Sequence, residues 1–96
     1  MPKGYWVTTY RAIKDADKFA AYAKLAGPSI EAGGGKFVVR GNPVKTFENG
    51  LMQRCVVTEF PSVAAAIAAH DSPGYKAALE ALGDGADRDI RIVEGL

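Results

Sequence analysis

Residues 53–75 constrain the fold of this chain most, because a strand pattern is followed at once by two helix starts. In the strand pattern, Cys55, Val57 and Glu59 share one face, while Arg54, Val56, Thr58 and Phe60 share the other. The pair Pro61-Ser62 then offers an N-cap to the alanine-rich run 63–70, and Ser72-Pro73 repeats the signal with proline at the first helical position. We therefore predict a strand over residues 52–60, a helix over 63–70 and a further helix from Pro73.

The rest of the chain completes two strand–helix–strand units. Aromatic and β-branched residues favour strands over residues 4–11, 36–41 and 88–93, and a short edge strand over 44–47 would add a hairpin between the two halves. Asp15 is a good N-cap for a helix with apolar residues at helical spacing. We expect a kink or break at Pro28, because proline cannot donate a hydrogen bond to the carbonyl four residues earlier.

This order favours an α+β fold of the ferredoxin-like βαβ-βαβ type, with a four-stranded antiparallel sheet and helices on one face. With 96 residues, the chain is expected to form a single domain over 1–96. Both faces of the first strand carry large side chains such as Tyr5 and Trp6, and each exposed apolar side chain forgoes about 1.5–3 kcal/mol. We therefore predict a homodimer formed through the sheet face.

Composition and charge exclude several kinds of partner. The 12 Lys and Arg are interspersed with 11 Asp and Glu, so no basic stripe is available for nucleic acid. No apolar run approaches the roughly 20 residues that span a bilayer, and no long apolar segment follows Lys3 as in a signal peptide. The single cysteine, Cys55, excludes an internal disulfide. We expect a cytoplasmic protein with no nucleic-acid and no membrane partner.

His70 is the candidate catalytic residue, because a side chain with a pKa of about 6.5 can transfer protons near neutral pH. It also lies at the expected end of a helix, where the dipole favours the imidazolium form, so a half-exposed capping role explains it equally well. Ser72 is most simply a helix cap. One His and one Cys far apart cannot form a structural zinc site, and we expect neither a metal nor a cofactor.

Other residues are candidates for a ligand pocket between the sheet and the helices. Arg40, Arg54 and Glu59 are expected inside strands. A strand guanidinium can bind a carboxylate or an enolate, and the alternative for all three residues is an ion pair on the sheet surface or at the dimer rim. Aromatic residues such as Tyr22 can line a pocket for a planar ligand or simply belong to the core. The candidate ligand-binding residues are Arg40, Arg54, Glu59, Tyr75 and Trp6.

Five short motifs follow one another along nearly the whole chain. They are Gly4-Tyr5-Trp6-Val7, the run from Gly34 to Gly41, the run from Arg54 to Ser62, Asp71-Ser72-Pro73-Gly74-Tyr75, and Val93-Glu94-Gly95. This ordered set resembles the DUF1330 family of the dimeric α+β barrel superfamily. The resemblance implies a ferredoxin-like fold and a dimer. Related families include cofactor-free monooxygenases, lactone isomerases and haem-binding enzymes. His70 departs from the large, often aromatic residue expected at its position, so a histidine-based mechanism is not implied.

Two classes of function remain. The first is a cofactor-independent enzyme, monooxygenase- or isomerase-like, that acts on a small organic acid or aromatic compound; Arg40 or Arg54 would hold the anion and His70 would move a proton. The second is a non-catalytic dimeric module that binds a small molecule or a protein partner at the same place. A cavity that brings together His70, an arginine and a carboxylate would favour the enzyme.

Overall fold

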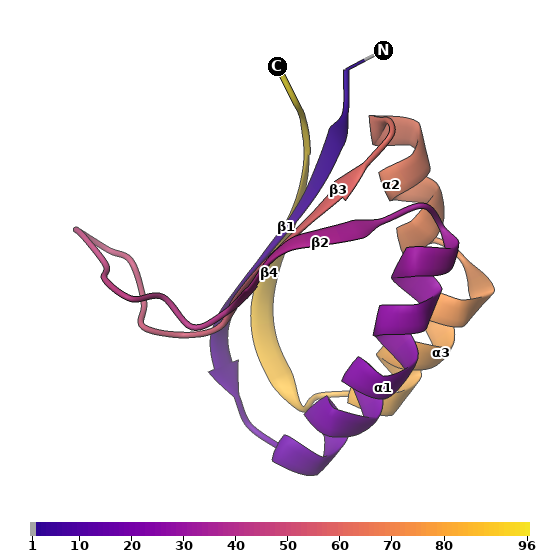
Figure 1. Cartoon of the computed structure of the whole chain (residues 1–96). Helices are drawn as coiled ribbons and strands as arrows, with labels where there is room; N and C mark the ends of the chain where they lie inside the picture. The colour runs from indigo at the N-terminus through magenta and orange to yellow at the C-terminus, as the bar shows by residue number, and fades with distance from the viewer. Residues whose placement is uncertain (1) are drawn as a thin grey trace.

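The structure is a computed structural model that describes residues 2–96 and contains one four-stranded sheet and three helices (Figure 1). In chain order the elements are β1 (Gly4–Ile13), α1 (Ala16–Ala32), β2 (Lys36–Gly41), β3 (Cys55–Phe60), α2 (Val63–His70), α3 (Pro73–Leu82) and β4 (Ala86–Glu94). The strand order is β2-β3-β1-β4, and all neighbouring strands are antiparallel. This is the predicted ferredoxin-like α+β fold.

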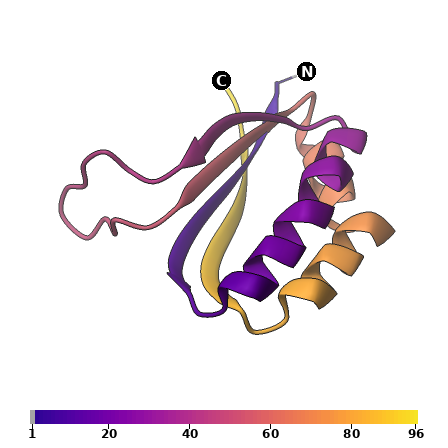
Figure 2. The same ribbon diagram turned by 60° about the horizontal axis from the view of Figure 1, so that its bottom comes forward.

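The helices cover one face of the sheet, and the core lies between the two layers (Figures 1 and 2). Along β1, Trp6, Thr8 and Tyr10 are buried against the helices, while Tyr5 and Val7 point to the opposite side. The register extends that opposite side across the sheet. We call it the outer face; it carries Tyr5, Val7, Val39, Cys55, Val57, Glu59, Asp89, Arg91 and Val93.

Side-chain caps set the helix starts where the sequence predicts them. Asp15 accepts a hydrogen bond from the Lys18 amide at 3.0 Å, and Ser62 accepts one from the Ala65 amide at 3.1 Å. Ser72 accepts a longer one from the Tyr75 amide. Its hydroxyl also donates to the Ala69 carbonyl at 2.8 Å, so Ser72 joins the end of α2 to the start of α3. The observed α2 has the predicted bounds.

The predicted break at Pro28 is wrong, because α1 continues through it to Ala32. Pro28 itself is exposed, whereas Tyr22, Ala26 and Ile30 form a buried stripe that spans the proline. Packing of this stripe against the core maintains the helix on both sides of Pro28. None of the helices in residues 2–96 is long and apolar enough to cross a membrane.

The predicted edge strand over 44–47 is also wrong. Residues 42–54 form an extended loop without regular strands, here called the arm, which projects from the sheet away from the helices (Figures 1 and 2). Val44 is 100% exposed and Phe47 74% exposed, so no neighbouring layer stabilises strand pairing there. As a result β3 begins at Cys55 rather than at residue 52. In contrast, β1 and β4 pair further than predicted, to Ile13 and Ala86.

Candidate functional site

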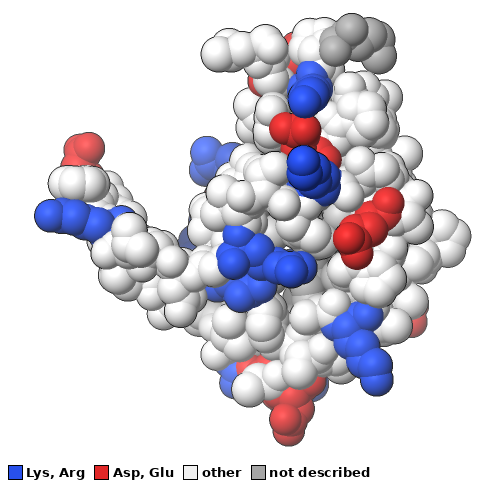
Figure 3. Space-filling model, viewed as in Figure 1, with Lys and Arg blue, Asp and Glu red and all other residues white. Residues whose placement is uncertain are grey.

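A cavity of about 240 Å³ lies between the sheet and α1. Its walls include the aromatic side chains Trp6, Tyr10, Phe19, Tyr22 and Phe37 and the two arginines Arg40 and Arg54. Within residues 2–96, the side chains that line it include no aspartate, glutamate, histidine, lysine or cysteine. The site is therefore aromatic and basic, without an acidic group of its own. Figure 3 shows basic side chains gathered near the middle of one face of the molecule, beside a hollow.

The register of the sheet gives this cavity two different ends. At one end, Thr58 pairs with Trp6 on one side and with Phe37 on the other, and Ile30 of α1 lines the cavity too. We call this the apolar end (Trp6, Ile30, Phe37 and Thr58). At the other end, Tyr10 donates its amide to the Arg54 carbonyl at 3.0 Å and pairs with Arg88 on β4. The arginine end comprises Tyr10, Tyr22, Arg54 and Arg88, whereas Arg40 pairs with Val56 midway along the cavity and its guanidinium lies over Phe37.

Arg88 is held by three tyrosine hydroxyls. Its Nη1 donates to the Tyr22 hydroxyl at 2.8 Å and to the Tyr10 hydroxyl at 3.4 Å, and its Nη2 donates to the Tyr75 hydroxyl at 3.1 Å. The guanidinium also lies over the Tyr22 ring, 4.5 Å from its centroid. Arg88 does not line the cavity itself but stands behind Tyr10 and Tyr22, which do. Arg88 can therefore act on a ligand only indirectly, because its hydrogen bonds polarise the hydroxyl groups of Tyr10 and Tyr22.

Burial determines the direction of the hydrogen bond between Tyr22 and Tyr75, whose hydroxyl oxygens are 2.8 Å apart. Tyr75 is 0% exposed, and among residues 2–96 its hydroxyl has only Tyr22 and Arg88 as hydrogen-bond partners. Arg88 is a donor, so Tyr22 is the acceptor that satisfies the Tyr75 proton. If Tyr22 donated instead, a fully buried O–H would lack a partner, at a cost of about 1–3 kcal/mol. This direction leaves the Tyr22 proton available to a ligand.

Burial also keeps Tyr75 and Tyr10 protonated. It raises the pKa of Tyr75 strongly, and the neighbouring Tyr22 adds to the increase. Burial likewise raises the pKa of Tyr10, although Arg88 and Arg54 oppose it. Burial disfavours the charge of Arg88, but the tyrosine oxygens outweigh it, so the pKa of the guanidinium is raised. At neutral pH Arg88 is thus a cation beside the neutral hydroxyl groups of Tyr75 and Tyr10.

Arg40 and Arg54 stand at the cavity with aromatic neighbours instead of carboxylates. The Arg40 guanidinium carbon lies 4.6 Å from the Phe37 centroid, and that of Arg54 lies 5.6 Å from the Phe19 centroid. Among residues 2–96, neither arginine nor Arg88 forms an ion pair. Arg40 is exposed and Arg54 half-buried, so their guanidinium groups can meet an entering anion.

His70 lies outside this cavity, at the C-terminal end of α2. Its Nδ1 is 3.1 Å from Asp71 Oδ1, and its side chain is 38% exposed. The imidazole ring contacts Trp6 and Tyr75, with centroids 5.3 and 5.2 Å away. The structure therefore does not bring His70, an arginine and a carboxylate together in one cavity.

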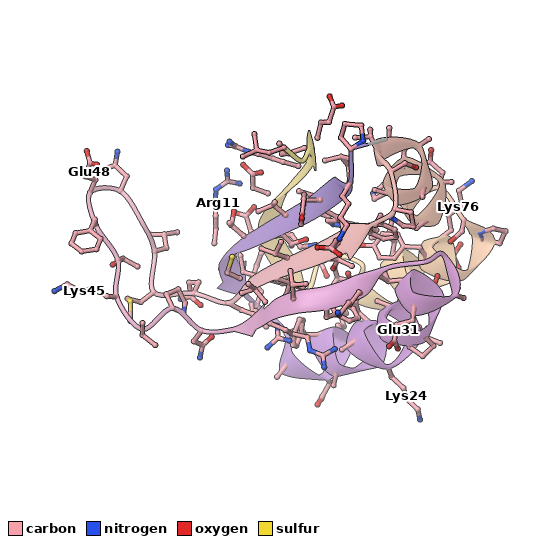
Figure 4. The ribbon with its side chains drawn as sticks, turned by 45° about the horizontal axis from the view of Figure 1, so that its top comes forward. Arg11, Lys24, Glu31, Lys45, Glu48 and Lys76 are labelled. Carbon is pink, nitrogen blue, oxygen red and sulfur yellow. The ribbon has the colours of Figure 1, made fainter. Side chains whose placement is uncertain are left out.

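Glu59 points away from the cavity, to the outer face. It accepts hydrogen bonds from Lys3 Nζ and from the Tyr5 hydroxyl, both at 3.1 Å. The hydrogen bond from Lys3, followed by that from Tyr5, lowers the pKa of Glu59 below its usual value. This arrangement matches the surface ion-pair alternative for Glu59. Figure 4 places Glu48 near the tip of the arm and Lys24 and Glu31 on the outside of α1, away from the sheet.

The other predicted residues lie in or beside the cavity. Trp6, Arg40 and Arg54 line it, and Tyr75 is joined to it through Tyr22. Sequence reasoning missed Arg88 and Tyr10. The available signal was alternation on β4, where Arg88 occupies the same face as Ile90 and Ile92. A charged residue in an otherwise apolar face is a candidate site residue.

Comparisons with known proteins place the chain among small ferredoxin-like proteins. The family model described as "Domain of unknown function (DUF1330)" matches residues 3–96. The structure of RPA0582, a protein of unknown function from Rhodopseudomonas palustris, is 23% identical with a TM-score of 0.76, over 99% of this chain and 83% of that one. A comparison with curated proteins finds no match.

Two further structures share the fold at lower identity. A dimeric ferredoxin-like protein of unknown function from Thermobifida fusca is 18% identical with a TM-score of 0.65, over 97% of this chain and 91% of that one. SnoaB, a cofactor-independent oxygenase from Streptomyces nogalater, is 16% identical with a TM-score of 0.61, over 97% and 92% of the two chains. At these identities the likeness concerns the fold alone.

Proposed function

This chain belongs to the DUF1330 family, whose description assigns no activity, and we propose that it binds a small organic acid or aromatic compound as an anion. The ligand occupies the cavity between the sheet and α1, with its negative charge at the arginine end and its apolar part toward the apolar end. A volume of about 240 Å³ suits a compound with a single ring rather than a large cofactor.

One observation carries this proposal: an aromatic cavity is flanked by Arg40, Arg54 and Arg88, and no carboxylate of residues 2–96 pairs with them. Taking a guanidinium out of water costs free energy unless an anion compensates. A ligand carboxylate provides that anion and can accept two parallel hydrogen bonds from one arginine. The aromatic walls then bury the ring.

Calorimetric titration with benzoate and with benzamide, its neutral analogue, tests the proposal. We expect benzoate to bind at millimolar concentration or below and benzamide to bind at least about tenfold more weakly, since a hydrogen bond to a charged group contributes roughly 1.5–3 kcal/mol. Arg54→Met should weaken benzoate binding, whereas Arg91→Met, which alters an outer-face ion pair with Asp89, should not. Equal affinity for benzoate and benzamide, or no binding of either, would overturn the proposal.

We further propose that the protein is a homodimer formed through the outer face. Val7, Val57 and Tyr5 are only half-buried in one chain, and Val39 and Val93 remain 48% and 49% exposed. The arm adds exposed apolar side chains, which are Val44, Phe47, Leu51 and Met52. A second copy can cover both surfaces. The ferredoxin-like protein from Thermobifida fusca is described as dimeric, which supports a dimer of this fold.

Light scattering tests the dimer. We expect twice the chain mass of 10.2 kDa at micromolar concentration. Val57→Lys should produce monomers, because it places a charge in the middle of the outer face. Leu25→Lys is the matched control, since Leu25 is exposed on α1 and lies away from the sheet. A stable monomer of the unaltered chain would contradict the dimer.

A catalytic role is the more specific form of the same proposal. The Tyr22 hydroxyl, with its proton free and Arg88 behind it, can stabilise an enolate or phenolate oxygen as an oxyanion site does. This suits a cofactor-independent enzyme of the monooxygenase or isomerase kind, and the fold shared with SnoaB is consistent with it. The substrate would have to be acidic, because the cavity lining contributed by residues 2–96 contains no histidine, cysteine or carboxylate that could act as a base near neutral pH.

That lack of a base favours the second candidate, a non-catalytic module that binds a small molecule. Oxygen uptake and mass spectrometry on a panel of phenols and β-keto acids distinguish the two candidates. Turnover that Tyr22→Phe reduces would support the enzyme, with His70→Ala measured beside it to test proton transfer from outside the cavity. Binding without turnover of any panel member would support the module.

A further inference from the structure

We propose that the hydroxyl groups of Thr8 and Thr58 bind a neutral oxygen of the ligand, which is then an organic acid that also carries a hydroxyl or carbonyl group. This inference rests on the proposed function and specifies its ligand class. Both side chains line the cavity, on the face of the sheet that the helices cover. We call them the threonine pair.

The threonine pair is buried more deeply than is usual for polar side chains. Thr8 is 5% exposed and Thr58 is 1% exposed, and apart from aromatic residues they are the buried polar side chains of residues 2–96. Burying a hydroxyl without a hydrogen bond costs free energy, and valine has nearly the same shape without that cost. A threonine at both positions therefore requires a hydrogen-bond partner.

Neither hydroxyl has that partner within the described chain. Among residues 2–96, no hydrogen bond joins the side chain of Thr8 or of Thr58 to another residue. In the same part of the chain, no fully enclosed polar side-chain atom lacks a hydrogen-bond partner, so both hydroxyls must border accessible space. The cavity is the accessible space next to both residues. The two hydroxyls are therefore open to a ligand there.

The strand register places the two threonines diagonally on neighbouring strands. Thr8 on β1 pairs with Val56 on β3, and Thr58 follows two residues later on the same face, where it pairs with Trp6. Such diagonal neighbours have Cα atoms about 7–8 Å apart. The threonine pair thus extends from the middle of the cavity to its apolar end, over a length comparable to that of a substituted ring.

A neutral oxygen suits the threonine pair better than an apolar or a charged group does. An apolar ring over these hydroxyls would displace the water that they can bind in the free protein and would not replace its hydrogen bonds, which weakens binding. A second carboxylate would lose its hydration there, and neutral hydroxyls do not compensate for that loss. A ligand hydroxyl can both donate to and accept from a threonine, and a ligand carbonyl can accept.

Pairs of ligands of similar size test the proposal, because a methyl group replaces a hydroxyl without its hydrogen bonds. The 3- and 4-hydroxybenzoates, the 3- and 4-methylbenzoates and benzoate would be titrated by calorimetry into the unaltered protein. We expect at least one hydroxybenzoate to bind about threefold or more tightly than its methyl counterpart, as one neutral hydrogen bond would give. No such gain in either pair, with benzoate still bound, overturns this inference and leaves the anion-binding proposal intact. No binding of any of the five acids overturns both.

Valine variants assign the gain to its source. Thr8→Val and Thr58→Val each remove one hydroxyl, so each should reduce the gain, and the double variant should abolish it while benzoate binding persists. Thr9→Val is the matched control and should keep the gain, because Thr9 is exposed on the opposite face of β1. A gain that persists in the double variant, or that is lost in Thr9→Val, overturns the inference.

Thermal denaturation of the two single variants checks that the hydroxyls have no partner within the protein. Because neither hydroxyl bonds another of residues 2–96, neither Thr8→Val nor Thr58→Val should melt below the unaltered protein. A melting temperature lower by more than about 4 °C in both variants would show that the hydroxyls are already bonded within the fold, which overturns the inference. The ligand pairs on the unaltered protein decide the ligand class even if a variant does not fold.

Discussion

The hydroxyl oxygens of Tyr22 and Tyr75 lie 2.8 Å apart, and Arg88 donates a hydrogen bond to each of them. These three side chains come from α1, α3 and β4, so one triangle of hydrogen bonds joins the two longer helices to the edge strand β4. The same triangle orients the Tyr22 proton. Stability and ligand binding therefore depend on the same side chains, and variants within the cluster should affect both.

Arg88→Lys should lower the free energy of unfolding by about 1–3 kcal/mol. An ammonium is a compact group that cannot bridge three hydroxyls as the planar guanidinium does. Urea denaturation measures the loss. Lys24→Arg is the control for a lysine–arginine exchange: Lys24 is exposed on the outside of α1, away from the proposed dimer face, so its change should cost less than about 0.5 kcal/mol. Equal losses in the two variants would mean that the tyrosine cluster adds no stability.

The protein should lose stability as the pH rises above about 10, the pKa of tyrosine in an unfolded chain. Burial raises the pKa of Tyr75 and of Tyr10 in the folded state, so the unfolded chain releases these protons first. Stability from these groups is therefore complete below pH 10 and declines above it. Urea midpoints at pH 8, 10 and 11 measure the decline. Tyr75→Phe should flatten it, and an equally steep decline in that variant would contradict this origin.

Local signals predicted the helices well because each start depends on side chains within three residues. The caps at Asp15, Ser62 and Ser72 are of this kind. Two local signals were overruled by the rest of the structure. Pro28 lies within a helix that its buried stripe stabilises, and residues 44–47 lack a packing partner that would make them a strand.

The candidate site was predictable only in part. The predicted alternation over residues 54–60 correctly placed Arg54 and Glu59 on opposite faces, although β3 begins only at Cys55, and of the two only Arg54 lines the cavity. The cluster around Arg88 depends on contacts across the chain, since Tyr10 and Arg88 are 78 residues apart in sequence. Such contacts follow from the strand register, which the sequence pattern does not determine by itself.

Gly4→Ala should destabilise the fold by about 1–3 kcal/mol or more. A Cβ on Gly4 would lie 2.6 Å from the Ser62 carbonyl oxygen and 2.7 Å from the Val63 Cα, and both are backbone atoms that cannot rotate away. Gly41→Ala is the control in another strand, because a Cβ there meets nothing within 4 Å. Thermal denaturation compares the two. A stable Gly4→Ala protein would show that β1 and the start of α2 are less closely packed than this.

Gly27→Ala and Pro28→Ala should separate stability from ligand binding within a single turn of α1. Alanine at position 27 should stabilise the helix by about 0.5–1 kcal/mol relative to glycine, and its Cβ meets nothing within 4 Å. Gly27 lines the cavity, however, so the added methyl occupies ligand space and benzoate binding should weaken. Pro28 is exposed and does not line the cavity, so Pro28→Ala should leave benzoate affinity unchanged. It should stabilise the protein by about 1–2 kcal/mol, because removing proline from the helix interior stabilises the folded state by more than the unfolded chain gains in entropy. Urea denaturation and calorimetry on both variants test this. Weaker binding in Pro28→Ala, or unchanged binding in Gly27→Ala, would place the ligand elsewhere than against this turn of α1.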